Sequence, residues 1–357
     1  MVIEMKNSLG FRMKKLIVFG MGICLLLALT ACGKEEQNSG LTAIDPSQSA
    51  GSSTGQDHSG GEGTLSKDDG WDVAAILAEG YYNTEYREYF VGGISFALDE
   101  DAKTATATST YTIDTTEYYM PDEFSYEGTQ YKVTGSEDGV FSDGDATRVR
   151  LSGNLTKVPD SMFYGCEELT EVVIPEGVTE ISDSAFTLCS ALQYVKLPKT
   201  LKKIGAEAFF GCGSLTGLVI PDGVSEIGES AFYECSLLKE IVFPAALRKI
   251  PDEALSNCVC LEKVVIPQGV GQIGYEVFWG CSALKEVEIP DSVVLMGTRV
   301  FYDCSALEKI TLPANLMEVD AEMFSFCEKL KQVNASATVA ELLQDEMPVA
   351  EFEIVIR

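Results

Sequence analysis

Cysteine recurs every 23 residues through the second half of this 357-residue chain, and proline keeps the same interval from Pro175 to Pro313. A fixed period of about 20–50 residues is typical of a solenoid, because one repeat cannot bury its apolar side without neighbours. The pattern therefore predicts stacked coils. The repeating cysteines are Cys166, Cys189, Cys212, Cys235, Cys258, Cys281, Cys304 and Cys327.

Each repeat follows the order Ala-Phe-x-x-Cys-x-x-Leu-x-x-Val-x-Leu-Pro, as in residues 185–198. The first half places apolar groups three residues apart, which predicts a short helical or 3₁₀ turn facing the core. The second half alternates, which predicts a short strand with Val195 and Leu197 pointing inward. Only Leu255 interrupts the phenylalanine column. The expected fold is an α/β solenoid of 23-residue leucine-rich coils with short strands, helical turns and an N-terminal β cap.

The N-terminal residues 1–31 have the pattern of a secretory signal peptide. Lys14 and Lys15 precede an apolar run that is too short for a comfortable membrane span. The sequence Leu-Thr-Ala-Cys ending at Cys32 resembles a bacterial lipobox. This resemblance implies cleavage before Cys32, lipidation of Cys32 and an extracytoplasmic protein held at a membrane by its lipid alone. A plain secreted protein is the alternative.

Residues 32–70 are rich in Ser, Gly and acidic residues and predict a flexible linker, because they cannot bury enough apolar surface to order. Residues 71–134 predict the N-terminal β cap. Within it, the alternating segments 93–98 and 104–110 form one expected hairpin, and 117–120 and 130–133 form a second.

The solenoid is expected over residues 135–335 and a C-terminal cap over 336–357. In this cap, Thr338 and Glu341 match a capping box at the start of a helix. Residues 351–356 then alternate as an edge strand would.

The cysteine column has three possible meanings: disulfides, a zinc array or part of the core. Parallel side chains on stacked coils suit disulfide geometry poorly, and zinc sites need closer pairs or histidines. We therefore expect a structural ladder of buried thiols that donate weakly to backbone carbonyls. Cys260 is out of register, and is either a reactive surface thiol or an extra buried hydrophobe.

The composition argues against several functions. A net charge of −29 disfavours nucleic acid as a partner. His58 is the only histidine and lies in the linker, so no histidine-based catalytic centre is expected. The acidic segments 136–139 and 143–145 fail the calcium-loop pattern and are better explained as solvated turns. We expect no metal, no cofactor and no enzymatic activity.

The repeat pattern resembles the BspA-like leucine-rich repeat of bacterial surface proteins over about residues 135–335, in eight copies. The resemblance implies display on the cell surface and adhesion, through an extracellular protein or glycan ligand. It implies less about any particular partner, because fold does not determine function.

Two columns are candidate ligand surfaces. Outward strand positions carry Val173, Tyr194, Val219, Val242 and Val265. Positions after the core phenylalanine carry Tyr164, Phe210, Tyr233, Trp279 and Tyr302. Strand propensity explains the first set equally well, and packing between coils explains the second. The expected function is non-catalytic, lipid-anchored surface binding. A structural lipoprotein that organises the envelope is the alternative, and an enzyme is the third.

Overall fold

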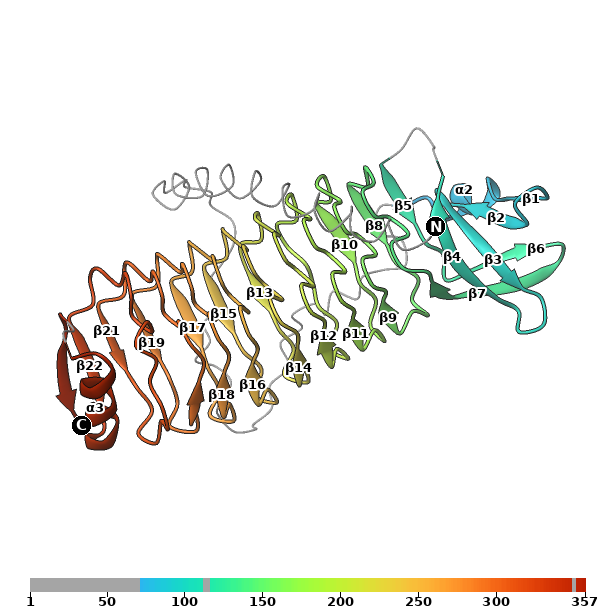
Figure 1. The fold of residues 1–357 in the computed structure, drawn as a ribbon. Helices are drawn as coiled ribbons and strands as arrows, with labels where there is room; N and C mark the ends of the chain where they lie inside the picture. Colours follow the sequence, from blue (N-terminus) through green and yellow to red (C-terminus); the bar gives the residue numbers. More distant parts are fainter. Residues whose placement is uncertain (1–70, 112–115, 349–350) are drawn as a thin grey trace, which may run out of the picture.

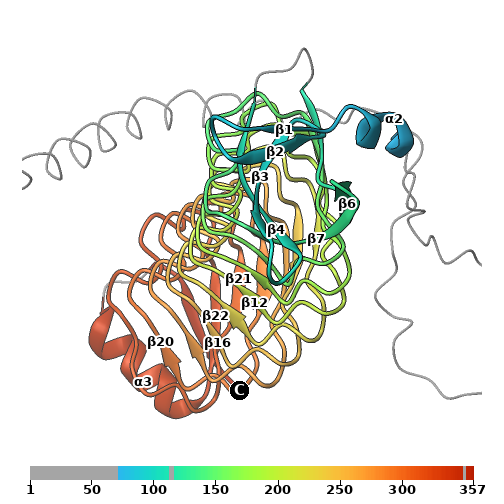
Figure 2. The ribbon, with the colours of Figure 1, turned by 90° about the vertical axis from the view of Figure 1, so that its right-hand side faces the viewer.

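A computed structural model describes residues 71–111, 116–348 and 351–357. The predictions for the signal peptide, the linker, His58 and Cys32 lie outside the described residues. The described chain forms an elongated β-solenoid with a separate sheet at its N-terminal end (Figure 1). Figure 2 looks along the stack, with the N-terminal sheet in front and helix α3 (Ala337–Glu346) at the far end.

The N-terminal part begins with helix α2 (Val73–Ala78) and continues as a six-stranded sheet in the order β1-β2-β3-β4-β7-β6. Stacked rings fill one side of this sheet, with Tyr89 and Phe124 centroids 4.4 Å apart. Strands β3 and β4 pair antiparallel, as their alternation predicts. The strands are β1 (Tyr81–Asn83), β2 (Glu88–Val91), β3 (Ile94–Asp99), β4 (Thr104–Thr110), β6 (Glu123–Tyr126) and β7 (Thr129–Ser136).

The second predicted hairpin is wrong. Strand β5 (Glu117–Tyr119) pairs in parallel with β8 (Arg148–Arg150) of the solenoid, while β6 pairs with β7. The reason is burial: the Tyr118 ring packs edge-on against Phe141 at 5.4 Å and so extends the apolar core of the coils. Arg150 strengthens the join, because its guanidinium lies over the Tyr119 ring and pairs with Asp122 at 3.1 Å.

Each coil can contribute two short strands, and both columns pair in parallel at steps of 23 residues. The first column contains β8, β10 (Glu171–Val173), β13 (Leu218–Val219), β15 (Glu240–Val242), β17 (Lys263–Val265), β19 (Glu286–Glu288), β21 (Lys309–Thr311) and β22 (Gln332–Ala335). The second contains β9 (Lys157–Val158), β11 (Glu180–Ile181), β12 (Lys203–Ile204), β14 (Glu226–Ile227), β16 (Lys249–Ile250), β18 (Gln272–Ile273) and β20 (Leu295–Met296).

The core is built from identical side chains stacked coil on coil. Phe186 and Phe209 lie 5.2 Å apart with ring planes only 6° from parallel. The stack resumes beyond Leu255, where Phe278 and Phe301 lie 5.3 Å apart. Because each ring meets its own counterpart in the next coil, the 23-residue period sets the register along the solenoid.

The predicted helical turn is absent, and the segment between the strands is a run of turns. Its amides donate to the next coil: Phe163 to the Ala185 carbonyl and Gly165 to the Thr187 carbonyl, both at 2.8 Å. Ser161 and Gly165 have left-handed φ angles of 54° and 69°. Backbone polar groups that find partners in a neighbouring coil need no helical ladder, which explains the difference.

The C-terminal end closes the core with α3, whose residues Val339, Ala340 and Leu343 are buried. The N-cap is Ser336 and not Thr338, because the Ser336 hydroxyl accepts from the Val339 amide and also donates to Ala314 of the previous coil. Strand β23 (Glu353–Ile356) then pairs in parallel at the edge of the sheet, as predicted. No helix in the described ranges is long and apolar enough to cross a membrane.

Candidate functional site

A strip of exposed valines crosses the outward face of the larger sheet. Val219 is 70% exposed, Val242 41% and Val265 38%, and the pairing of β13, β15 and β17 places them side by side. Tyr194, 61% exposed, lies one coil earlier in the neighbouring outward column. Val173 is half-buried and lies two coils before Val219, so it does not join them. We call Tyr194, Val219, Val242 and Val265 the valine strip.

Gly217 interrupts the outward column between Tyr194 and Glu240. A Cβ atom added there would meet no atom within 4 Å, and the residue does not have a positive φ. Neither space nor backbone conformation therefore requires glycine. Gly217 directly precedes strand β13, which begins at Leu218. The outward column therefore lacks a side chain in the coil after the exposed Tyr194.

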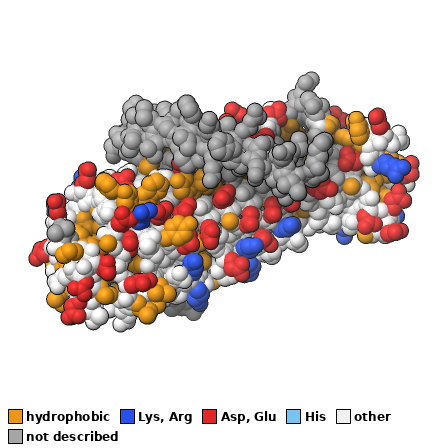
Figure 3. Space-filling view, in the orientation of Figure 1, with side chains coloured by type: hydrophobic (Ala, Val, Ile, Leu, Met, Phe, Trp, Pro, Cys, Tyr) orange, Lys and Arg blue, Asp and Glu red, His pale blue; other side chains and the backbone are white. Residues whose placement is uncertain are grey.

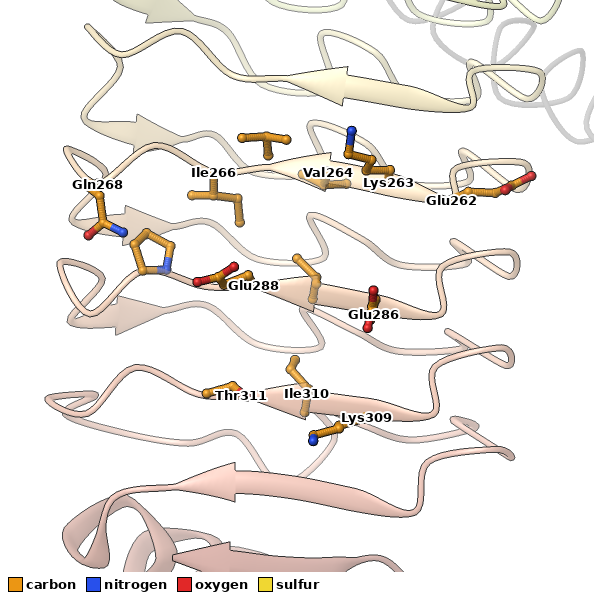
Figure 4. Close-up of a pocket in the computed structure, with 13 residues that line it drawn as sticks. Glu262, Lys263, Val264, Ile266, Gln268, Glu286, Glu288, Lys309, Ile310 and Thr311 are labelled. Atoms are coloured by element: carbon orange, nitrogen blue, oxygen red, sulfur yellow. The ribbon is translucent and has the colours of Figure 1, made fainter. Parts of the chain in front are cut away.

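The strip runs into a hollow of about 820 Å³ over β17, β19 and β21. Val265 lines it together with Lys263, Glu286, Glu288 and Lys309, whose side chains Figure 4 shows along the same face. The ladder between β17 and β19 is reduced to the single pair Val265 and Glu288. The hollow thus combines an apolar floor with charges of both signs, which is suited to binding an amphipathic surface.

A second hollow of about 480 Å³ lies over β12 and β14 on the other sheet. The column of charges that crosses it alternates from coil to coil through Glu180, Lys203 and Glu226, of which the last two line the hollow. The Lys203 ammonium pairs with Glu180 at 2.8 Å. Opposite charges on adjacent strands stabilise a sheet modestly. The alternating charges of this column are therefore explained by their contribution to the stability of the sheet.

The eight repeating cysteines are free thiols, and all but the partly exposed Cys327 are buried. Each Sγ donates a hydrogen bond to the backbone carbonyl of the core residue in the preceding coil. The distance from sulfur to carbonyl oxygen is 2.9 Å for Cys166 and Phe141, and 3.3 Å for Cys235 and Phe209. Burial raises the pKa of Cys166 to about 12. These thiols stay protonated at neutral pH, which suits the donor role and leaves little nucleophilic thiolate.

Cys260 is only 2% exposed and packs beside Val259 and Leu237, so it is not a surface thiol.

In the acidic turn, Asp145 accepts a hydrogen bond from the Tyr118 hydroxyl at 3.2 Å. Burial, with the Asp145 charge second, raises the pKa of Tyr118 to about 12. Within the described residues, no group of three or more His, Cys, Asp or Glu side chains could hold a metal ion.

The second candidate ligand surface, formed by the residues that follow the core phenylalanines, contains two pairs of rings. Tyr164, Phe210, Tyr233, Trp279 and Tyr302 are all half-buried. Phe210 and Tyr233 stack at 4.8 Å with an angle of 2°, so they pack mainly on each other. Trp279 and Tyr302 lie 6.4 Å apart and are tilted by 43°.

Sequence reasoning missed Phe326, whose ring lies 5.0 Å from Tyr302 and is 63% exposed. Its signal was a phenylalanine at the position where Gly165, Gly211 and Gly280 stand in other coils. We call Trp279, Tyr302 and Phe326 the turn-edge aromatic cluster.

Solved structures with a similar fold are leucine-rich repeat proteins. One from Bacteroides ovatus is 23% identical, with a TM-score of 0.62, over 75% of this chain and 76% of that chain. One from T. pallidum is 24% identical, with a TM-score of 0.48, over 60% of this chain and 88% of that chain. The likeness to the first supports the leucine-rich repeat fold. No curated protein matches the chain.

The model of the BspA type leucine rich repeat region matches residues 156–285 and 248–346, with six copies of the repeat. Together these ranges cover more than half of the chain. The stacked phenylalanines, buried cysteines and in-register strands described above lie largely within them. The chain therefore belongs to the BspA-type leucine-rich repeat family.

Proposed function

We propose that this protein is a non-catalytic binding protein of the bacterial surface, and that it holds a partner protein against the valine strip and the adjoining hollow. The observation that carries the proposal is the strip itself. Three valines on adjacent strands, 38% to 70% exposed, form one apolar surface on a rigid sheet. Contiguous exposed apolar surface is typical of interaction sites.

The strip favours a protein partner over a glycan. Its valines are aliphatic, whereas sugars are usually held on aromatic faces, and only Tyr194 offers a ring there. The polar rim fits the same partner. The Lys263 ammonium pairs with Glu240 at 2.5 Å, and Glu286 and Lys309 lie opposite each other on β19 and β21. An apolar centre with a charged rim is the usual anatomy of a protein interface.

The binding site can be tested with the full chain on a panel of purified extracellular-matrix proteins and glycans, by surface plasmon resonance. We expect Val242→Glu to weaken binding of the matching protein at least about tenfold, because it places an unpaired charge in the interface. Leu295→Glu is the matched control, since Leu295 is a 36% exposed strand residue on the other sheet. Unchanged binding by Val242→Glu would remove the strip from consideration, and no binding in the panel would favour the structural-lipoprotein alternative.

The proposed membrane attachment rests on the lipobox-like sequence that ends at Cys32. A lipid on Cys32 would hold the solenoid at the outer side of a membrane without a protein span. Cys32→Ala is then expected to move the protein from the membrane fraction to the medium in a bacterial host that processes lipoproteins. Retention of Cys32→Ala in the membrane fraction would contradict the anchor and leave the binding proposal intact.

A further inference from the structure

The turn-edge aromatic cluster places three rings on three successive coils. Trp279 and Tyr302 are tilted by 43° and Tyr302 and Phe326 by 60°, with centroids 6.4 and 5.0 Å apart. The three rings therefore do not share one flat plane, and their faces point in different directions. Aromatic cages recognise cationic groups through the negative faces of their rings.

Phe326 is a large apolar side chain that is mostly open to solvent, with 63% of its surface exposed. Its left-handed φ of 63° is shared by every coil at this position, including the non-glycine residues Leu188 and Asp303, so the backbone alone does not distinguish it. The other large apolar side chain in this column, Leu188, is only 36% exposed.

The edge beside the cluster already binds one cation of the chain itself. The Arg299 side chain pairs with Glu322 at 2.6 Å and with Glu276 at 3.4 Å, and its guanidinium carbon lies 5.9 Å from the centre of the Tyr302 ring. Carboxylates and a ring face therefore act together on a guanidinium at this edge. The arrangement demonstrates the chemistry that a second cation would use.

Two more carboxylates lie near the cluster without a cation. Asp303, directly after Tyr302, and Glu328, two residues after Phe326, are both exposed, and neither makes an ion pair with another described residue. Partial desolvation of the Asp303 carboxyl group first, and then the Glu328 charge, raises its pKa, although the residue as a whole is exposed. Like charges held together are relieved by a cation between them. Acidic side chains also spread along the surface shown in Figure 3, and the net charge of −29 attracts cationic partners.

We propose that the turn-edge aromatic cluster, together with Asp303, binds a positively charged arginine or lysine side chain of a partner protein. The cation would face the Tyr302 and Phe326 rings, with the Asp303 carboxylate as its counter-charge. This site is separate from the valine strip: it lies in the turns and not on the strands, and it selects charge where the strip selects apolar surface.

The experiment uses the full chain and three probes: a fluorescein-labelled hexa-arginine peptide, choline chloride as competitor, and a neutral chito-oligosaccharide. Binding of the peptide is followed by fluorescence anisotropy at several salt concentrations. We expect Phe326→Asn and Asp303→Asn each to weaken peptide binding about fivefold or more. Asn tolerates left-handed backbone, so Phe326→Asn should remain folded, which circular dichroism and an unchanged or higher Tm would verify.

Glu341→Gln is the matched control, because it removes one exposed carboxylate on α3, outside the cluster. The inference requires its peptide affinity to stay within about twofold of the parent chain. Equal weakening by Glu341→Gln and Asp303→Asn would mean diffuse attraction and would overturn the site. Peptide binding that survives Phe326→Asn would do the same, as would oligosaccharide binding that this variant abolishes. Competition by choline would support a site that recognises positive charge without other contacts to the peptide. Val242→Glu should leave peptide binding unchanged, so failure here and failure of the proposed function are distinguishable.

Discussion

Replacing Cys235 with serine tests whether the cysteine column is a buried apolar ladder. The Cys235 side chain is fully buried, and its sulfur lies 3.3 Å from the Phe209 carbonyl oxygen. A serine hydroxyl is carried on a shorter bond, so its oxygen would lie farther from that carbonyl than the sulfur does. It would then exceed the usual O–H···O distance of about 2.7–2.8 Å.

The size of the effect follows from these contacts. A buried hydroxyl without a good partner costs about 1–3 kcal/mol, or roughly 5- to 150-fold in the unfolding equilibrium constant. Cys235→Ala should cost less, about 1 kcal/mol, because it removes packing without adding a polar atom. The Phe209 carbonyl does not become unsatisfied in either variant, since the Cys212 amide still donates to it at 3.2 Å.

The measurement is urea unfolding of the purified chain, with the midpoint compared at constant slope. Cys327→Ser is the matched control: Cys327 donates to the Phe301 carbonyl at 3.0 Å but is partly exposed, so water can satisfy its hydroxyl. We expect the order of destabilisation to be Cys235→Ser first, then Cys235→Ala, then Cys327→Ser. An unchanged midpoint for Cys235→Ser would refute the assignment of this column to a dry core.

The free energy of unfolding should fall as pH rises above about 8.5, because the thiols of the unfolded chain ionise there. In the folded chain burial raises the thiol pKa, to about 12 at Cys166, so these groups stay protonated. Urea midpoints measured from pH 7 upward test this. The native chain should react slowly with a thiol reagent and the unfolded chain rapidly, as an absorbance assay would record. Gly228→Ala should destabilise the fold by several kcal/mol, because its Cβ would clash with the Ala206 amide, and thermal melting would reveal it.

The periodic features of the fold could be predicted from the sequence because their cause repeats. Cys235 and Phe209 recur every 23 residues, and such repetition requires identical environments in stacked coils. The parallel strands and the edge strand at 353–356 follow from alternation. The exposed Val219 could also be placed, since strand alternation puts it opposite the inward Leu218.

The features that were wrong or missed depend on contacts between distant segments. Spacing of three suggested a helical turn, but the Phe163 amide finds its partner in the next coil, which no local pattern reveals. Strand β5 alternates as a hairpin strand would, yet it joins the solenoid because Tyr118 extends the aromatic core at Phe141. The cluster around Phe326 depends on ring contacts between coils and on the exposure of the Phe326 side chain, which no local pattern reveals.

Neither Gly217 nor Phe326 is the residue that local stability would favour at its position, and a double variant tests that reasoning. Gly217→Ala should stabilise the folded chain by about 0.5–1 kcal/mol, since an added Cβ meets nothing within 4 Å. Phe326→Asn should add about 1 kcal/mol by relieving left-handed strain. The two effects should be additive because the residues lie in separate coils and share no contact partner. A chain that is more stable but binds its ligands less well would show that both residues are kept for binding. A double variant that is less stable than the parent would show instead that these residues serve the fold.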